Sequence, residues 1–201
     1  MYSNKTDLLG EIEGYISSLL NRGLAAPVSF HTITHTRTVV AAVTEIGAAS
    51  GLTPAQLELV QIAAWFHDAG YCYTYIGHEE ESKKIARQYL TQHGMPDAAI
   101  QQVLACIEAT KMPQHPLTLM EEVLCDADLY HLSQDNYQEE EALLREEWAG
   151  CLFRCFTDEE WNRMNDAFLI RHQYFTDYGR RVLQERKEMW LKKRDNRQAD
   201  I

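Results

Sequence analysis

The sequence predicts an all-α fold, a compact bundle of about seven to nine helices. Apolar residues recur at helical spacing in one segment after another, and no segment alternates convincingly like a half-buried strand. The 5 prolines and most of the 10 glycines lie between these periodic segments or at their ends. Because hydrophobic residues make up 45% of the chain, a full core can form. We find no repeat and no linker, so residues 1–201 are expected to form a single domain.

Five helices are predicted in the first 110 residues. Their spans are about Asp7–Leu20, Phe30–Ala49, Thr53–Gly70, Gly77–His93 and Pro96–Thr110. The third has the clearest start, because Thr53 is followed by a first-turn proline and by a glutamine suited to a capping box. The fourth opens with acidic residues, which favour the positive end of the helix dipole.

Further helices are predicted in the rest of the chain. One spans about Leu117–His131, another about Asn136–Gly150, and a third begins at a Thr157 cap. The third carries one apolar stripe, made of Trp161, Met164, Phe168 and Phe175. Together these segments complete the predicted bundle.

The charge is strongly negative and unevenly distributed. The net charge is −11, which argues against a protein that binds nucleic-acid polymers. Residues 171–201 nevertheless hold 9 Lys and Arg against 5 Asp and Glu. This basic end can attract an anionic substrate or partner, or it can be the solvated face of a helix.

The cysteines and the hydropathy pattern point to the cytoplasm. Five cysteines without CxxC spacing indicate reduced thiols rather than disulfides or a zinc knuckle. No stretch approaches the roughly 18 apolar residues of a membrane span. The N-terminus also lacks the apolar core of a signal peptide.

The segment Trp65–Gly70 places a histidine and a carboxylate, His67 and Asp68, at the end of an apolar helix. Burying an ionised carboxylate is costly unless it is paired or bound to a metal. His35 and Asp128 lie on other predicted helices and are expected to face the core. Two imidazoles and two carboxylates suit Mn, Fe, Ni, Co or Zn better than Ca, and they leave positions open for water and substrate. Each residue alone is more simply an ordinary core or surface residue.

The order His35, His67-Asp68, Asp128 resembles the HD superfamily of metal-dependent phosphohydrolases. The flanking stretches agree, and they are Phe30–Val39, Ala63–Tyr71, Gly77–Glu79 and Leu124–Leu129. The resemblance covers about residues 28–135, and the stretches 144–148, 160–161 and 171–176 are similar to the C-terminal part of one bacterial HD subgroup.

This resemblance implies an HD-domain helical bundle in which His35, His67, Asp68 and Asp128 hold a divalent metal ion. That ion would be Mn, Fe, Ni, Co, Zn or Mg, and a second ion is an open alternative. The helices at about 136–195 are expected to pack on the core region. Asp126 is expected to support the site or the fold rather than to bind the metal.

Other polar residues are candidates for catalysis or substrate binding. His78 and Glu79 resemble the segment that some HD enzymes place near the phosphate or a second metal; the alternative is an acidic first turn. Three cations can bind phosphate oxygens, although each can equally be a surface charge. They are Lys111 as a catalytic group, and Lys83 and Arg145 as substrate-binding groups.

Histidines and tyrosines near these segments have weaker assignments. His115, in a loop between prolines, is a candidate lid and substrate-binding residue, or an ordinary loop residue. His31 shares a predicted helix face with His35 and is expected to support it. Tyr71, Tyr73 and Tyr75 either stack on a base or pack in the core.

The sequence therefore predicts a metal-dependent phosphohydrolase that cleaves a phosphomonoester or a phosphodiester with activated water. Asp68 is expected to help accept the proton of that water. The family analogy favours a small phosphorylated substrate, a nucleotide above all, and a homodimer is an open alternative to the monomer. Two other functions compete: a catalytically weak HD-fold sensor of a nucleotide or metal, and a helical scaffold with incidental histidines.

Overall fold

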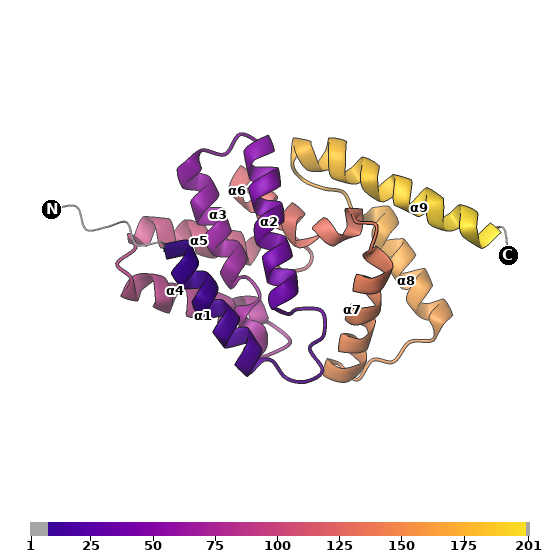
Figure 1. The fold of residues 1–201 in the computed structure, drawn as a ribbon, viewed down its shortest axis with the longest axis horizontal. Coiled ribbons are helices and arrows are strands. Elements are labelled where there is room, and N and C mark those ends of the chain that lie inside the picture. Colours follow the sequence, from indigo (N-terminus) through magenta and orange to yellow (C-terminus); the bar gives the residue numbers. More distant parts are fainter. Residues whose placement is uncertain (1–7, 200–201) are drawn as a thin grey trace.

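The computed structural model describes the backbone of residues 8–199 and the side chains of residues 8–192. Over this range the chain forms nine α-helices and no strand, which confirms the predicted all-α fold (Figure 1). The helices are α1 Leu8–Gly23, α2 Ile33–Ala49, α3 Pro54–Phe66, α4 His78–Gln92, α5 Asp97–Ala109, α6 Leu119–Asp128, α7 Tyr137–Cys151, α8 Asp158–Arg171 and α9 Gln184–Ala199. Three short helical turns join them: η1 Ala69–Cys72, η2 Tyr130–Ser133 and η3 Gly179–Leu183.

Helix α3 lies at the centre of the main core, which helices α1 to α6 build around it. The side chains of Ile62, Ala63 and Phe66 are fully buried, as the apolar character of this helix predicts. A smaller apolar cluster joins η2 to the last three helices through Leu132, Tyr137, Leu169 and Trp190. In Figure 1, helices α7, α8 and α9 stand together at the C-terminal end of the molecule. No helix in residues 8–199 is long and apolar enough to cross a membrane.

The prediction that the third helix continues to Gly70 is wrong, because α3 ends at Phe66. His67 and Asp68 follow the helix, and Asp68 leaves the helical conformation with φ −104° and ψ 3°. The turn η1 then packs closely on the start of α4: the N–H of Gly70 donates to the hydroxyl of Ser82 at 2.8 Å. A Cβ at Gly70 would lie 1.9 Å from the carbonyl oxygen of His78, so only glycine allows this approach.

The apolar stripe up to Phe175 also predicts too long a helix, because α8 ends at Arg171. The carboxylate of Asp126, at the end of α6, binds the segment beyond it. Asp126 accepts the backbone N–H of Phe175 at 2.7 Å, the N–H of Thr176 at 2.9 Å and the Thr176 hydroxyl at 2.7 Å. These contacts give Asp126 a structural role, as the sequence predicts, and they fix where the chain turns back toward α9.

Replacing Asp126 by alanine should destabilise the protein strongly. The change leaves three donors of Phe175 and Thr176, two of them buried, without an acceptor, which should lower the free energy of unfolding by about 2–4 kcal/mol. Urea unfolding followed by circular dichroism measures this difference. The exposed Asp135 supplies the control, since Asp135→Ala should change stability by no more than about 0.5 kcal/mol. Equal stability of the two variants would contradict the anchoring role.

Candidate metal centre

Four polar side chains meet where three helices of the main core end or begin. His35 lies in the first turn of α2, and Asp128 is the last residue of α6. His67 and Asp68 follow directly after α3. Ligand atoms of His35, His67 and Asp128 all lie within 4.8 Å of one another, so one metal ion can contact all three. The structure therefore brings together the residues that the sequence analysis grouped from distant segments.

The nitrogens of the two histidines face the oxygens of the two carboxylates. His67 Nε2 lies 3.1 Å from Asp68 Oδ2 and 3.4 Å from Asp128 Oδ1. His35 Nε2 lies 3.2 Å from Asp128 Oδ1 and 3.5 Å from Asp68 Oδ2. His35, His67 and Asp68 are buried, whereas the side chain of Asp128 is 19% exposed and marks the open side of the cluster.

The orientation of His67 fits a metal ligand. Its Nδ1 donates a hydrogen bond to the carbonyl oxygen of Ala64 at 2.7 Å, so Nε2 is the ring nitrogen that faces the cluster. Nε2 of His67 and Oδ2 of Asp68 are both buried without a hydrogen-bond partner, despite their short separation. Buried polar atoms of this kind require an explanation. A divalent cation between them would satisfy both, and the donor set of two imidazoles and two carboxylates fits such an ion.

The charges in the cluster depend strongly on one another. Burial lowers the pKa of His67, but the negative charge of Asp68 and the contacts with Asp128 outweigh it and raise this pKa well above its usual value. Burial raises the pKa of Asp68, and the opposing charge of His67 brings it below the usual range. The pKa of Asp128 is lowered in the same way by His35 and His67. Positive charge beside the two carboxylates therefore favours their ionised form.

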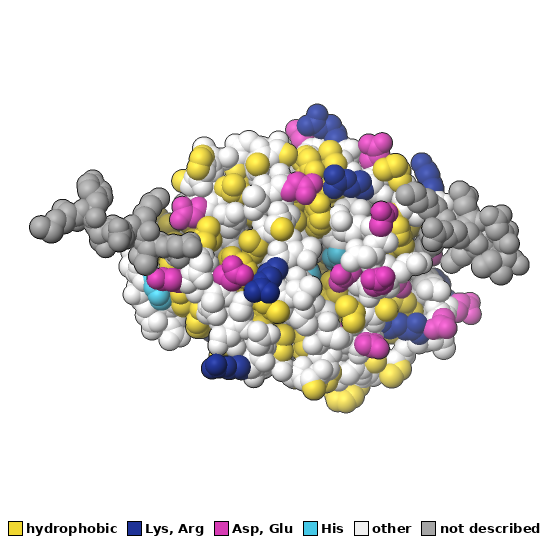
Figure 2. Space-filling view, in the orientation of Figure 1, with side chains coloured by type: hydrophobic (Ala, Val, Ile, Leu, Met, Phe, Trp, Pro, Cys, Tyr) yellow, Lys and Arg dark blue, Asp and Glu magenta, His cyan; other side chains and the backbone are white. Residues whose placement is uncertain are grey.

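His78 and Glu79 also lie at this centre. His78 Nε2 is 3.6 Å from Asp68 Oδ1 and 3.8 Å from Glu79 Oε1. The side chain of His78 is 15% exposed, so it borders the cluster on the side that solvent can reach. Figure 2 shows histidine side chains in a small hollow near the middle of one face, with acidic side chains beside them. His78 therefore borders Asp68, and Glu79 lies beside His78; their roles in catalysis stay predictions.

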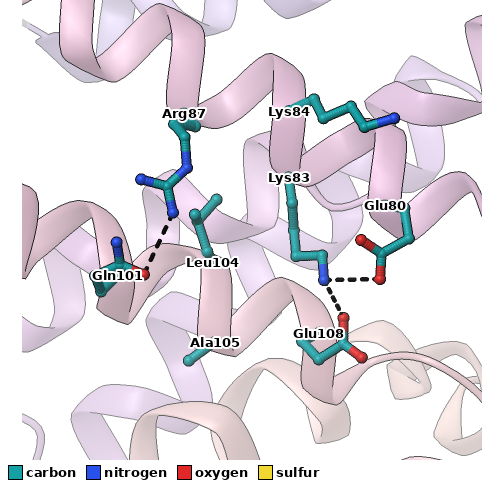
Figure 3. A pocket seen from close by; sticks show the side chains of 8 residues that line it. All are labelled: Glu80, Lys83, Lys84, Arg87, Gln101, Leu104, Ala105 and Glu108. Carbon is teal, nitrogen blue, oxygen red and sulfur yellow. Dashed lines mark hydrogen bonds and ion pairs between the residues drawn. The ribbon is translucent and has the colours of Figure 1, made fainter.

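Lys83 lies in a groove between α4 and α5, and none of the four candidate ligands is among the residues that line this groove (Figure 3). Its ammonium group pairs with Glu80 at 2.9 Å and with Glu108. The groove has a volume of about 410 Å³. Lys111 and His115 line a neighbouring groove of about 400 Å³ that continues along α5. Their roles in substrate binding or catalysis remain predictions.

Arg145 binds the segment that connects α7 to α8. Its guanidinium donates to the carbonyl oxygen of Phe156 at 2.6 Å and pairs with Asp158 at 2.8 Å. The same group lies 5.9 Å from the centre of the Trp161 ring. Its assignment to substrate binding likewise stays a prediction. These contacts give Arg145 a structural role that requires no substrate.

Two residues around the centre had no assigned role from the sequence. His131 packs against the rings of Phe30 and His35, and burial together with the charge of His35 lowers its pKa to about 3. Glu147 of α7 binds His31, whose expected supporting position next to His35 agrees with the geometry. A histidine three residues after Asp128 could have been noticed. Glu147 lies in the stretch 144–148 that resembles an HD subgroup, but nothing in its acidic helix distinguishes it from the neighbouring glutamates.

A family model described as the HD domain matches residues 32–133, half of the chain. The chain belongs to the HD-domain family. The matched region contains all four candidate ligands as well as His78 and Glu79, and it ends before α7 begins. No curated protein matches the sequence significantly.

Three solved bacterial structures have the same fold. A protein described as a predicted HD superfamily hydrolase, from an uncultured Thermotogales bacterium, has a TM-score of 0.63 at 19% identity, over 96% of this chain and 92% of that one. A Listeria innocua protein has a TM-score of 0.64 at 18% identity, over 94% and 93%. A Lactobacillus plantarum protein has a TM-score of 0.68 at 15% identity, over 100% and 98%. Helices α7 to α9 thus lie within the shared fold.

Divalent metal ions should stabilise this HD-domain protein against heat through the four residues. With Mn²⁺ at roughly 100 times its dissociation constant, binding contributes about 2.7 kcal/mol and should raise Tm by about 5–10 °C. His67→Ala should abolish the rise, because it removes a buried nitrogen that no other group replaces. The exposed His93 offers the matched control, and His93→Ala should keep the full rise. An equal rise in both variants, measured by differential scanning fluorimetry, would place the metal elsewhere.

Proposed function

We propose that this HD-domain protein is a divalent-metal-dependent phosphohydrolase that cleaves a phosphomonoester or phosphodiester bond, with a nucleotide as the preferred substrate class. The observation that carries the proposal is that two imidazoles and two carboxylates meet at one point. There, Nε2 of His67 and Oδ2 of Asp68 are buried without hydrogen-bond partners. The description of the Thermotogales relative as a predicted hydrolase supports the reaction class. The preference for a nucleotide comes from the family analogy alone.

Each residue of the centre has a role in this reaction. His35, His67, Asp68 and Asp128 would hold the cation, which would lower the pKa of water and polarise a phosphoryl oxygen. In the hydrolysis, the oxygen of water forms a bond to phosphorus as the bond from phosphorus to the leaving oxygen breaks. One proton leaves the attacking water, and the leaving oxygen gains one.

Asp68 and His78 are placed to handle these protons. Asp68 is an ionised carboxylate whose Oδ1 lies 3.6 Å from His78 Nε2, so Oδ1 can accept a proton from water while Oδ2 faces the histidines. His78 is partly exposed and can donate a proton to the leaving oxygen. Glu79, beside His78, is a further carboxyl group at the centre.

Replacing Asp68 by alanine should abolish metal-dependent hydrolysis. The assay incubates wild type and Asp68→Ala with Mn²⁺ and a panel of mono-, di-, tri- and cyclic nucleotides, and it measures released phosphate and monophosphates. Wild type should turn over at least one compound. The variant should lose more than about 1000-fold in kcat, since it loses both a ligand and a proton acceptor.

Circular dichroism provides the control, because the variant should keep the helical spectrum of wild type. Full activity of a folded Asp68→Ala variant would contradict the mechanism. Tight nucleotide binding by wild type without any turnover would instead support the sensor.

A further inference from the structure

Glu147 of α7 is a fully buried carboxylate outside residues 32–133, the part that the HD family model matches. Its Oε2 accepts the backbone N–H groups of Phe30 at 2.8 Å and of His31 at 3.0 Å. Its Oε1 contacts His31 Nδ1 at 2.5 Å and accepts the hydroxyl of Tyr75 at 2.7 Å. Four donors on two oxygens offset much of the cost of burying this charge.

These donors come from the two segments that lead into the metal centre. Phe30 and His31 directly precede α2, which carries His35 in its first turn. Tyr75 lies just before α4, whose first residue is His78. A single carboxylate on α7, in the C-terminal part of the chain, therefore binds both the segment before α2 and the segment before α4.

A stack of aromatic rings continues from Glu147 to the candidate ligands. The ring of His31 stacks on Tyr71 with centroids 4.3 Å apart, and the Tyr71 hydroxyl lies 3.3 Å from His31 Nε2. Tyr71 in turn stacks on His78 at 3.8 Å and 17°. His78 Nε2 then faces Asp68 Oδ1 at 3.6 Å. Every step between Glu147 and Asp68 is thus a direct contact.

We propose that Glu147 is a positioning residue for the hydrolysis. By holding His31 and Tyr75, it fixes the stack in which Tyr71 keeps the ring of His78 turned toward Asp68. This inference rests on the proposed function, because the orientation of His78 matters only if His78 meets the substrate. Glu147 itself contacts none of the four candidate ligands among the interactions described. Two routes lead on from its partner His31: one to the ring of His35, with centroids 5.6 Å apart, and one through Tyr71 to His78. We assign the effect on the reaction to the second route.

The first test is the variant Glu147→Gln, which keeps the size of the side chain and removes its charge. The amide nitrogen cannot accept a hydrogen bond, so some of the four donors lose their acceptor. We expect kcat to fall about 10-fold or more on the best substrate of the nucleotide panel, with KM little changed.

Glu121→Gln is the matched control for this variant. Glu121 is also a buried glutamate, and it accepts the N–H of Leu117 at 2.7 Å and the hydroxyl of Thr118 at 3.0 Å, at the start of α6. This control should keep the kcat of wild type. An equal loss of kcat in both variants would reduce the role of Glu147 to general stability and overturn the proposal.

A double-mutant cycle tests whether Glu147 acts through His78. Once His78 is replaced by alanine, the further change Glu147→Gln should lower kcat by less than about twofold, because the ring to be positioned is gone. Fully additive losses of kcat would show that Glu147 affects the reaction by another route, and they would contradict the proposal.

Nuclear magnetic resonance of ¹⁵N-labelled histidine gives a readout in the metal-free protein that does not require activity. Glu147→Gln should shift the ring signals of His31, its direct partner, and also those of His78, which it does not touch. The ring signals of the exposed His93 should stay in place. An unmoved His78 signal would overturn the inference even if wild type hydrolyses nucleotides, whereas a wild type without turnover would contradict the proposed function itself.

Tyr75→Phe keeps the test open if Glu147→Gln does not fold. This change removes one donor to Glu147 and keeps the charge and the backbone contacts. We expect a smaller decrease in kcat and a smaller shift of the His78 signal in the same direction. An unchanged kcat together with an unchanged His78 signal would contradict the proposal.

Discussion

The burial of the Asp68 carboxylate beside His67 is the constraint on which the rest of the centre depends. Asp68 is only 3% exposed, and an ionised carboxylate in such a place needs a compensating charge. His67 and His35 face it, yet its Oδ2 forms no hydrogen bond. The arrangement is unfavourable for a protein without a cation and favourable for one that binds it, which is the pattern expected when function rather than stability selects the residues.

The position of this pair just beyond α3 has a geometric reason. Side chains of consecutive residues in a helix diverge around the axis, so adjacent residues do not face each other. The chain leaves the helical conformation at Asp68, and this allows His67 and Asp68 to turn toward one point. The close packing of Gly70 against α4 holds the new direction and brings His78 alongside. One change of backbone direction therefore shapes the ligand pair and its nearest neighbour together.

Helical periodicity and capping signals were sufficient to predict the all-α fold, because each element has its own apolar face. The Thr53 capping box and the Thr157 cap form as predicted. The ends of α3 and α8 were not predictable, since they depend on contacts with residues distant in sequence. Gly70 packs on α4, and Asp126 binds Phe175 and Thr176 across about fifty positions. Local patterns carry no information about such contacts.

The candidate site was predictable only where residue chemistry is unusual. His67-Asp68 in an apolar segment is conspicuous, and the structure brings His35 and Asp128 to it. A single Lys or Arg carries no such signal, since its partners come from other elements; Lys83, for example, pairs with Glu108 of α5. Glu147 could not be singled out, because it is one of several glutamates in an acidic helix and the others, such as Glu139, are exposed or only partly buried.

The most direct test of the central claim is to locate the metal by anomalous X-ray diffraction from crystals soaked in Mn²⁺. The account predicts a strong peak in direct contact with Nε2 of His35, Nε2 of His67 and the carboxylates of Asp68 and Asp128. A second, weaker peak near His78 would be compatible with it. A crystal in which Mn²⁺ binds only elsewhere, or one without any peak among these four side chains at saturating metal, would contradict it.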